Sequence, residues 1–247
     1  MLKFLGVIPA RYASTRFPGK PLAILGRKPM IQWVYEGASQ VFEDLVVATD
    51  DARIYDAVEA FNGRVVMTSP THESGTERCA EALKIYQQKT GLIFTHVANI
   101  QGDEPLIKKQ QLILLKECLE DQATEIATLV RPSVDPAEIE NPNVVKVVVD
   151  RDSRALYFSR SPIPNIRGSR QEWTKSNHYF LHLGLYGFRA DILLKLVALP
   201  PAPLERAESL EQLRWMEHGF AIRTGVTHFQ SMGVDTPEDL DSLNSMI

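Results

Sequence analysis

The sequence predicts an α/β fold with a mostly parallel central sheet flanked by helices, and three observations lead to it. Short apolar segments alternate with helical patterns through the first half of the 247-residue chain. These segments are continuously apolar, as expected for parallel strands that are buried on both faces. Apolar residues make up 44% of the chain and charged residues 23%, which is typical of a folded globular protein.

Four strand–helix pairs are expected before residue 122, each consisting of an apolar run and the helical pattern that follows it. The pairs are 4–8 with 29–42, 44–50 with 52–61, 64–69 with 75–89, and 94–104 with 109–121. Such alternation is typical of consecutive βα units.

The pattern changes after residue 125. The segments 125–132, 143–150 and 155–160 are strand-like and are separated by turn residues, which predicts a small antiparallel extension. Ser161–Ser176 is rich in proline, glycine and charge and is expected to be a loop. Because no repeat and no long linker divides the chain, we expect a single domain, 1–247.

Charge and cysteine content exclude several classes of function. The net charge of −4 provides no overall positive field, so neither nucleic acid nor an acidic membrane surface is an expected partner. Cys79 and Cys118 lack metal-ligand spacing and fit a reducing compartment. The amino terminus lacks a signal-peptide pattern, and no apolar stretch approaches the ~20 residues needed to span a bilayer. We therefore expect a cytoplasmic protein without membrane insertion.

A cationic loop follows the first strand. It carries Arg11, Arg16 and Lys20 around a Pro18-Gly19 turn. Neither G-x-x-x-x-G-K-[ST] nor G-x-G-x-x-G occurs in the chain, so the loop cannot bind phosphate through main-chain groups alone. Arginine and lysine side chains could bind the phosphate oxygens instead. A solvated basic turn is the alternative interpretation.

Two aspartates are candidate metal ligands. Asp103 lies in the motif NIQGDEP, which closes the strand FTHVANI (94–100), and the carboxyl ends of parallel strands are where open α/β sheets bind ligands. Asp235 precedes Thr236-Pro237, a helix start whose capping does not require it. Mg²⁺ prefers one or two carboxylates together with substrate phosphate oxygens. For Asp103, an acidic turn remains the alternative.

A capping-box pattern, Ser74 to Glu77, begins the third predicted helix. A capped helix N-terminus is also a contact point for anions and nucleotides. Arg78 lies one residue further on and strengthens the anion interpretation.

Two polar surfaces are predicted near the end of the chain. Alternation in 180–188 places leucines on one face and His182 and Tyr186 on the other, ~13 Å apart along the strand. The segment 203–219 is predicted to be one amphipathic helix, with Glu208, Glu211 and Gln212 on its polar side. From the residues alone, both surfaces are interpreted as solvated.

Taken together, the motifs resemble one family, the 3-deoxy-manno-octulosonate cytidylyltransferases, or CMP-Kdo synthetases. The resemblance extends in order from residue 4 to the end of the chain. The motifs are IPARYASTRFPGKPL, HESGTER, NIQGDEP, NPNVVKVV, ALYFSR, HLGLYGF, PLERAESLEQLRW and GVDTPEDL.

The resemblance implies a nucleotide-diphospho-sugar transferase (Rossmann-like) fold, a homodimer and a Mg²⁺-dependent reaction. CTP and 3-deoxy-D-manno-octulosonate (Kdo) would give CMP-Kdo and pyrophosphate for lipopolysaccharide biosynthesis. The implied nucleotide-binding residues are Arg11, Lys20, Ser74, Gly75, Arg78 and Gln101. The implied metal ligands are Asp103 and Asp235, which with Arg11 and Lys20 would form the catalytic set. The implied sugar-binding residues are Arg160, His182, Tyr186, Glu211 and Gln212.

Other functions remain open at this point. The same reaction on the 8-amino analogue of the sugar would need the same acid and anomeric contacts. A non-catalytic nucleotide-binding protein on this fold is a second alternative, which the presence of both aspartates disfavours. A dehydrogenase is disfavoured because the dinucleotide-binding glycines are missing.

Overall fold

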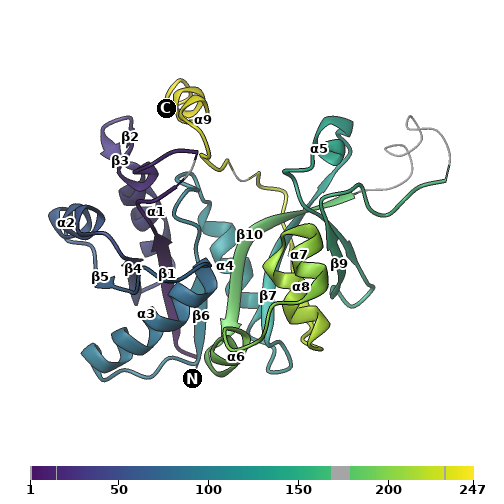
Figure 1. Ribbon diagram of the computed structural model, residues 1–247, viewed down its shortest axis with the longest axis horizontal. Helices are drawn as coiled ribbons and strands as arrows, with labels where there is room; N and C mark the ends of the chain where they lie inside the picture. The colour runs from purple at the N-terminus through teal and green to yellow at the C-terminus, as the bar shows by residue number, and fades with distance from the viewer. Residues whose placement is uncertain (1, 15, 168–178, 231) are drawn as a thin grey trace. The chain divides into compact units, whose positions relative to one another are not determined.

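The computed structural model describes residues 2–14, 16–167, 179–230 and 232–247 (Figure 1). It forms two compact units: the first comprises the described residues of 1–113 and 231–247, and the second those of 114–230. The single-domain assignment stays a prediction. Part of the expected loop, 168–176, lies outside the described residues. No helix in the described ranges is long and apolar enough to cross a membrane.

The first unit contains four parallel strands, as the sequence predicts. β1 (Phe4–Ala10) pairs on one side with β4 (Leu45–Thr49) and on the other with β6 (His96–Asn99). β5 (Val65–Met67) extends this sheet beyond β4. Every residue of β4 and β6 is buried, which explains why these strands are continuously apolar or carry small polar side chains.

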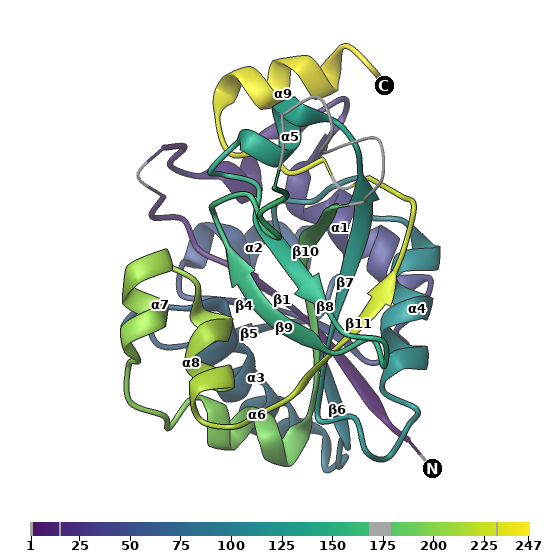
Figure 2. The same cartoon turned by 90° about the vertical axis from the view of Figure 1, so that its right-hand side faces the viewer.

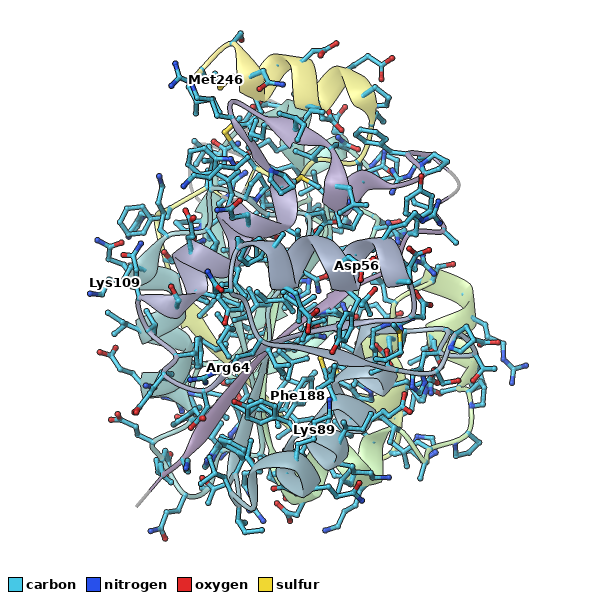
Figure 3. All side chains as sticks on the ribbon, turned by 90° about the vertical axis from the view of Figure 1, so that its left-hand side faces the viewer. Asp56, Arg64, Lys89, Lys109, Phe188 and Met246 are labelled. Atoms are coloured by element: carbon cyan, nitrogen blue, oxygen red, sulfur yellow. The ribbon has the colours of Figure 1, made fainter. Side chains whose placement is uncertain are left out.

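The predicted helices of the first half of the chain are confirmed, with bounds that differ from the prediction by three residues at most. They are α1 (Met30–Ser39), α2 (Ala52–Ala60), α3 (Gly75–Thr90) and α4 (Lys109–Cys118). The side chain of Asp51 caps α2, and that of Ser74 caps α3. Arg64, labelled in Figure 3, donates from Nη1 to the Tyr86 hydroxyl at 3.1 Å and so connects the start of β5 with α3.

The end of the chain packs on the first loop. After the short helix η1 (Lys20–Leu22) come β2 (Ile24–Leu25) and β3 (Lys28–Pro29), and the carboxyl terminus forms α9 (Pro237–Asn244). Thr236 caps α9 as predicted, accepting from Asp239 N at 3.2 Å. A small core cluster joins these segments. Its buried residues are Leu25, Met30, Val234 and Leu243.

The second unit contains the predicted antiparallel strands (Figure 2). β7 (Ile126–Ser133) pairs antiparallel with β10 (Tyr179–Arg189), and β8 (Lys146–Val149) pairs antiparallel with both β10 and β9 (Ala155–Ser159). β11 (Ile222–Val226) runs parallel to β7. The sequence analysis did not predict β11, because its arginine, threonine and glycine weaken the apolar signal.

The prediction of one helix over 203–219 is wrong. The segment forms α7 (Pro203–Glu208) and α8 (Glu211–Glu217), separated by Ser209 in the left-handed region (φ 53°) and Leu210 in an extended conformation. The other helices of this unit are α5 (Pro136–Glu140) and α6 (Ala190–Leu196). The break at Ser209 matters for the candidate site, since α8 begins two residues after it.

The predicted alternation in β10 holds only up to Leu183. The register shifts between Leu183 and Tyr186, so Leu185 and Tyr186 are both buried. Thr128 fills the irregularity: its hydroxyl lies 3.2 Å from the Leu183 carbonyl oxygen and 2.8 Å from that of Leu185. As a result the rings of His182 and Tyr186 pack against each other, with centroids 5.2 Å apart, instead of being separated along a regular strand.

Gly225→Ala should destabilise the second unit. A Cβ at Gly225 in β11 would lie 2.8 Å from Cys118 Sγ, 2.8 Å from Leu129 Cδ2 and 3.1 Å from Leu114 Cγ. Overpacking of this kind costs about 1–3 kcal/mol. Chemical denaturation should show that loss, whereas Gly233→Ala, where a Cβ meets nothing within 4 Å, is the control. Equal stability of the two variants would contradict the expected packing.

Candidate functional site

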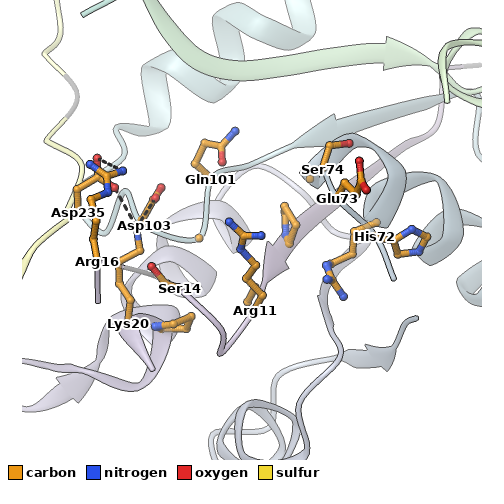
Figure 4. Close-up of a pocket in the computed structure, with 16 residues that line it drawn as sticks. Arg11, Ser14, Arg16, Lys20, His72, Glu73, Ser74, Gln101, Asp103 and Asp235 are labelled. Atoms are coloured by element: carbon orange, nitrogen blue, oxygen red, sulfur yellow. Dashed lines mark hydrogen bonds and ion pairs between the residues drawn. The ribbon is translucent and has the colours of Figure 1, made fainter. Parts of the chain in front are cut away.

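A cavity of about 300 Å³ lies in the first unit where β1 and β6 end (Figure 4). Four segments line it: the loop after β1, the turn before α3, the loop after β6 and the segment before α9. Its polar lining residues are Arg11, Ser14, Arg16, Lys20, His72, Glu73, Ser74, Arg78, Gln101, Asp103 and Asp235. All eight of the nucleotide and metal residues implied by the sequence line this one cavity, Gly75 included.

Close main-chain packing shapes the cavity wall. A Cβ at Gly102 would lie 2.8 Å from the Pro9 carbonyl oxygen, so only glycine lets the loop after β6 pass this close to the end of β1. A Cβ at Gly75, the first residue of α3, would lie 3.4 Å from the Pro9 ring, an ordinary van der Waals distance that places the start of α3 against the end of β1. The capped N-terminus of α3 is thereby held at the cavity, where its main-chain N–H groups favour an anion.

The two aspartates converge on one cation. Lys20 Nζ lies 2.7 Å from Asp103 Oδ2 and 3.2 Å from Asp235 Oδ1. Arg16 Nη2 lies 3.1 Å from the other oxygen of Asp235. A main-chain hydrogen bond of 2.9 Å from Val234 N to Asp103 O sets the two carboxylates side by side. Dashed lines in Figure 4 mark the ion pairs of Lys20 and Arg16 with the two aspartates.

This arrangement fits a divalent cation. The Lys20 ammonium stands where two carboxylate oxygens from distant parts of the chain meet, which is a position of the kind a Mg²⁺ ion would take. The described residues contain no group of three or more acidic, histidine or cysteine side chains that could hold a metal. Two carboxylates suit Mg²⁺ that takes its remaining ligands from phosphate oxygens and water.

Arg78 has structural partners. It is 3% exposed, and its Nη2 donates to Asp50 Oδ2 at 2.9 Å while its Nη1 donates to Thr68 Oγ1 at 2.7 Å. These partners follow β4 and β5, so Arg78 connects both strand ends to the first turn of α3. Its contact with the nucleotide stays a prediction, and its guanidinium already holds the turn that carries Ser74 in place.

His72 is a cavity residue that the sequence analysis missed. Its Nε2 lies 2.5 Å from Glu81 Oε2, which also accepts from Ser69 N at 2.8 Å. Burial by itself raises the pKa of Glu81, but the hydrogen bonds from Ser69 and His72 outweigh it and lower the pKa of that carboxyl. The sequence feature that could have identified His72 is its position two residues before Ser74, the cap of α3.

A second candidate region lies in the second unit, around the predicted sugar residues. The ring centroids of Tyr186 and Trp215 are 5.1 Å apart, nearly perpendicular, and Gln212 lies one helical turn before Trp215. Within the described residues, three buried polar atoms here have no hydrogen-bond partner. They are Tyr186 Oη, Gln212 Nε2 and Trp215 Nε1.

These unpartnered atoms mark a region suited to a polar ligand. A buried polar group without a partner costs about 1–3 kcal/mol, and native structures contain few such groups. Gln212 is 5% and Tyr186 7% exposed, so water satisfies neither fully. Burial raises the pKa of Tyr186 well above its usual value, and the charge of Glu211 adds to that shift, so the phenol stays a proton donor. Trp215 was not predicted as part of this region.

His182 is neutral, with a defined tautomer. Its Nε2 lies 3.0 Å from Thr128 Oγ1, whose single proton is donated to a main-chain carbonyl oxygen. Nε2 must therefore carry the imidazole proton and donate to Thr128, which leaves Nδ1 as the acceptor nitrogen. Although part of the side chain reaches the surface, burial of the imidazole lowers the pKa of His182 to about 3. Such a nitrogen can accept a hydrogen bond from a ligand hydroxyl.

Arg160 donates to three main-chain carbonyl oxygens. Its Nε donates to Glu208 O at 2.7 Å, its Nη1 to Pro142 O at 3.0 Å and its Nη2 to Ser209 O at 3.3 Å. A guanidinium carries five N–H groups, so two remain for another acceptor. Contact between Arg160 and a sugar carboxylate stays a prediction.

The chain is similar to a known protein family, to curated relatives and to solved structures. The family model described as cytidylyltransferase matches residues 5–224. The 3-deoxy-manno-octulosonate cytidylyltransferase of Phocaeicola vulgatus is 55% identical over 97% of this chain and 95% of its own length. That of Parabacteroides distasonis is 52% identical over 98% of this chain and 96% of its own length.

Solved structures agree with these sequence matches. CMP:2-keto-3-deoxy-manno-octonic acid synthetase complexed with CTP is 44% identical, has a TM-score of 0.89, and is matched over 99% of this chain and 98% of that one. A 4-diphosphocytidyl-2C-methyl-D-erythritol synthase from Anaerococcus prevotii, 13% identical over 99% of this chain and 98% of that one, has a TM-score of 0.60 and shows the fold alone. The predicted fold class is confirmed.

His182 should make stability depend on pH. The unfolded chain binds a proton at His182 near pH 6.5, whereas the folded chain does so only near pH 3. Stability from this group is therefore complete above pH 6.5 and is lost as pH falls, by at most about 1.4 kcal/mol per pH unit. Urea denaturation between pH 7 and pH 5 should show a shallower dependence in His182→Gln than in wild type. Exposed His228→Gln is the control, and equal slopes for wild type and His182→Gln would refute the assignment.

Proposed function

We propose, because the chain belongs to the 3-deoxy-manno-octulosonate cytidylyltransferase family, that it transfers CMP from CTP to Kdo with release of pyrophosphate. The observation that carries this proposal is the convergence of Lys20, Asp103 and Asp235 beside Arg11 at the ends of β1 and β6. Family membership also supports Mg²⁺ as the cation, a cytoplasmic homodimer and a role in lipopolysaccharide biosynthesis.

The cavity residues divide into two proposed roles. Asp103 and Asp235 would hold Mg²⁺, while Arg11 and Lys20 would bind the triphosphate. The Ser74-Gly75 start of α3 and Gln101 would contact the rest of the nucleotide. Arginine binds phosphate oxygens through two parallel hydrogen bonds, whereas lysine acts as a point charge that can follow the phosphate.

Both substrates are anions, so the reaction requires their negative charges to be neutralised. The anomeric hydroxyl oxygen of the sugar acid loses its proton to solvent and forms a bond to the α-phosphorus of CTP, while the bond from that phosphorus to the bridging oxygen of pyrophosphate breaks. A bound Mg²⁺ would acidify the hydroxyl and neutralise phosphate charge. Arg11 and Lys20 would hold the reacting phosphates in line and stabilise the charge on the leaving pyrophosphate, so positioning and electrostatics supply most of the catalysis.

The sugar acid would bind to the second unit. His182 Nδ1 would accept from a sugar hydroxyl, while Tyr186 and Gln212 would donate to sugar oxygens. Glu211 would accept from another hydroxyl, and the two remaining N–H groups of Arg160 would meet the carboxylate. Support comes from the buried, unpartnered donors of Tyr186 and Gln212, for which a polyhydroxylated acid supplies acceptors.

A coupled assay tests this function. The protein with CTP, Mg²⁺ and Kdo should release pyrophosphate, and Asp103→Asn and Asp235→Asn should each lose orders of magnitude in turnover while remaining folded. Asp241→Asn, an exposed change in α9, is the matched control. Faster release with the 8-amino analogue would favour that substrate. Failure with both sugars, despite CTP binding, would leave the non-catalytic alternative.

Lys20→Met should have opposite effects on metal and nucleotide binding. The ammonium and a divalent cation cannot share the same two carboxylate oxygens, so Lys20 must leave them before a metal binds. Removing the ammonium should therefore tighten Mn²⁺ binding to the nucleotide-free protein, measured by electron paramagnetic resonance, and weaken CTP binding. Lys28→Met, which removes a similar pair with Glu36, is the control. Unchanged Mn²⁺ affinity in Lys20→Met would show that Asp103 and Asp235 do not form the metal site.

A further inference from the structure

We propose that Lys146, Arg160 and Glu208 form a clamp that positions the first turn of α8 for binding the sugar acid. The inference rests on the proposed function, which assigns Glu211 and Gln212 of that turn to the sugar. Neither Lys146 nor Glu208 belongs to the proposed site. They act, with Arg160, through main-chain carbonyl and N–H groups, and we call the three residues the carbonyl clamp.

Lys146 is the fully buried residue of the clamp. Its side chain is 0% exposed, and its Nζ donates to three carbonyl oxygens: Asn141 O at 2.9 Å, Val144 O at 2.6 Å and Arg160 O at 2.5 Å. An ammonium has three N–H groups, so all are used. One charged group thus connects the loop before β8 with the end of β9.

Arg160 extends the connection to the helix break. Its side chain donates to the carbonyl oxygens of Glu208 and Ser209, which are the last residue of α7 and the residue that separates it from α8. It also donates to Pro142 O in the loop that Lys146 holds. The orientation of both carbonyl groups at the break is therefore set from outside the helices.

Glu208 closes the clamp from the helix side. Its Oε1 accepts from Ser159 Oγ at 2.6 Å, and its Oε2 accepts from Arg160 N at 2.9 Å. Its charge lies near two cations. Burial lowers the pKa of Lys146, and the nearby Arg160 charge adds to that shift, whereas the Glu208 carboxylate opposes it.

The start of α8 needs such external support. Its N-cap residue is Leu210, whose side chain cannot accept a hydrogen bond from the first turn. Ser209 before it adopts a left-handed conformation that is unfavourable for a residue other than glycine. Neither residue caps the first turn of α8, so support at its start comes from the clamp, while the Arg214–Glu205 ion pair connects the rest of α8 to α7. A displacement of about 1 Å at a substrate-positioning residue can cost 10²-fold in rate.

The rival explanation is that the clamp only stabilises the fold. The two explanations differ at Glu208, because the amide of Glu208→Gln can keep both hydrogen bonds: its nitrogen would donate to Ser159 Oγ, and its oxygen would accept from Arg160 N. Glu208→Ala loses both bonds. A positioning role therefore predicts that glutamine restores what alanine removes.

Steady-state kinetics in the sugar acid, with calorimetric titration of CTP, test the inference on the full-length protein. We expect Glu208→Ala to raise the KM for the sugar acid or lower kcat by about 10- to 100-fold, with CTP affinity unchanged. Glu208→Gln should recover most of this loss. The inference is overturned if Glu208→Ala lowers the melting temperature but keeps the kinetic constants, if it weakens CTP binding equally, or if glutamine restores nothing.

Two further variants complete the test. If Glu208→Ala does not fold, Ser159→Ala removes one of the two bonds and should still raise the sugar KM several-fold, whereas an unchanged KM overturns the inference. Gln212→Ala tests the proposed sugar site by itself. If Gln212→Ala raises the sugar KM and the Glu208 variants do not, the clamp inference is refuted while the proposed sugar site stands. If Gln212→Ala has no effect, the proposed sugar site is wrong, and the clamp falls with it.

Discussion

The shared ion pair of Lys20 with Asp103 and Asp235 is the interaction on which the cavity of the first unit depends. Asp235 lies 215 residues after Lys20 in sequence, and two neighbouring carboxylates would repel each other without a cation between them. The Val234–Asp103 main-chain bond and the small apolar cluster around Val234 bring the chain end back to the first loop. Apolar packing thus brings Asp235 near Asp103, and the Lys20 ammonium makes the close approach of the two carboxylates favourable.

Cations also organise the turns that carry the other site residues. Arg78 connects the ends of β4 and β5 to α3, and Lys146 and Arg160 bind main-chain carbonyl groups around α7 and α8. Loops at strand ends expose main-chain polar groups that lack partners in a regular ladder. A buried lysine or arginine supplies several donors at once, so one side chain can fix two or three segments. These cations hold the loops that carry the proposed ligand contacts.

The parts of the structure that follow local rules were predictable from the sequence. Buried parallel strands give continuous apolar runs, and the caps at Ser74 and Thr236 are local patterns, so the fold and both helix starts were predicted. The break at Ser209 was not, because Arg160 holds it from 49 residues earlier. The irregularity in β10 depends on Thr128, from a neighbouring strand. Trp215 was not predicted as part of the site, because a helical pattern says nothing about whether an indole N–H finds a partner.

The two candidate regions differ in whether their polar side chains already have partners in the absence of a ligand, and this difference bears on ligand selectivity. In the first unit, Lys20 and Arg16 pair with the carboxylates, so a ligand must replace ion pairs that already exist. Such a replacement is favourable only for a ligand that carries more negative charge than an aspartate and brings its own cation. A triphosphate with a divalent metal meets both conditions, whereas an uncharged nucleoside meets neither. In the second unit, the buried donors of Tyr186 and Gln212 have no partner among the described residues, so a ligand acceptor breaks no existing bond there. If the sugar acid binds there as proposed, selectivity would come from rejecting molecules that lack acceptors at those positions, because such molecules would leave the donors buried and unpaired.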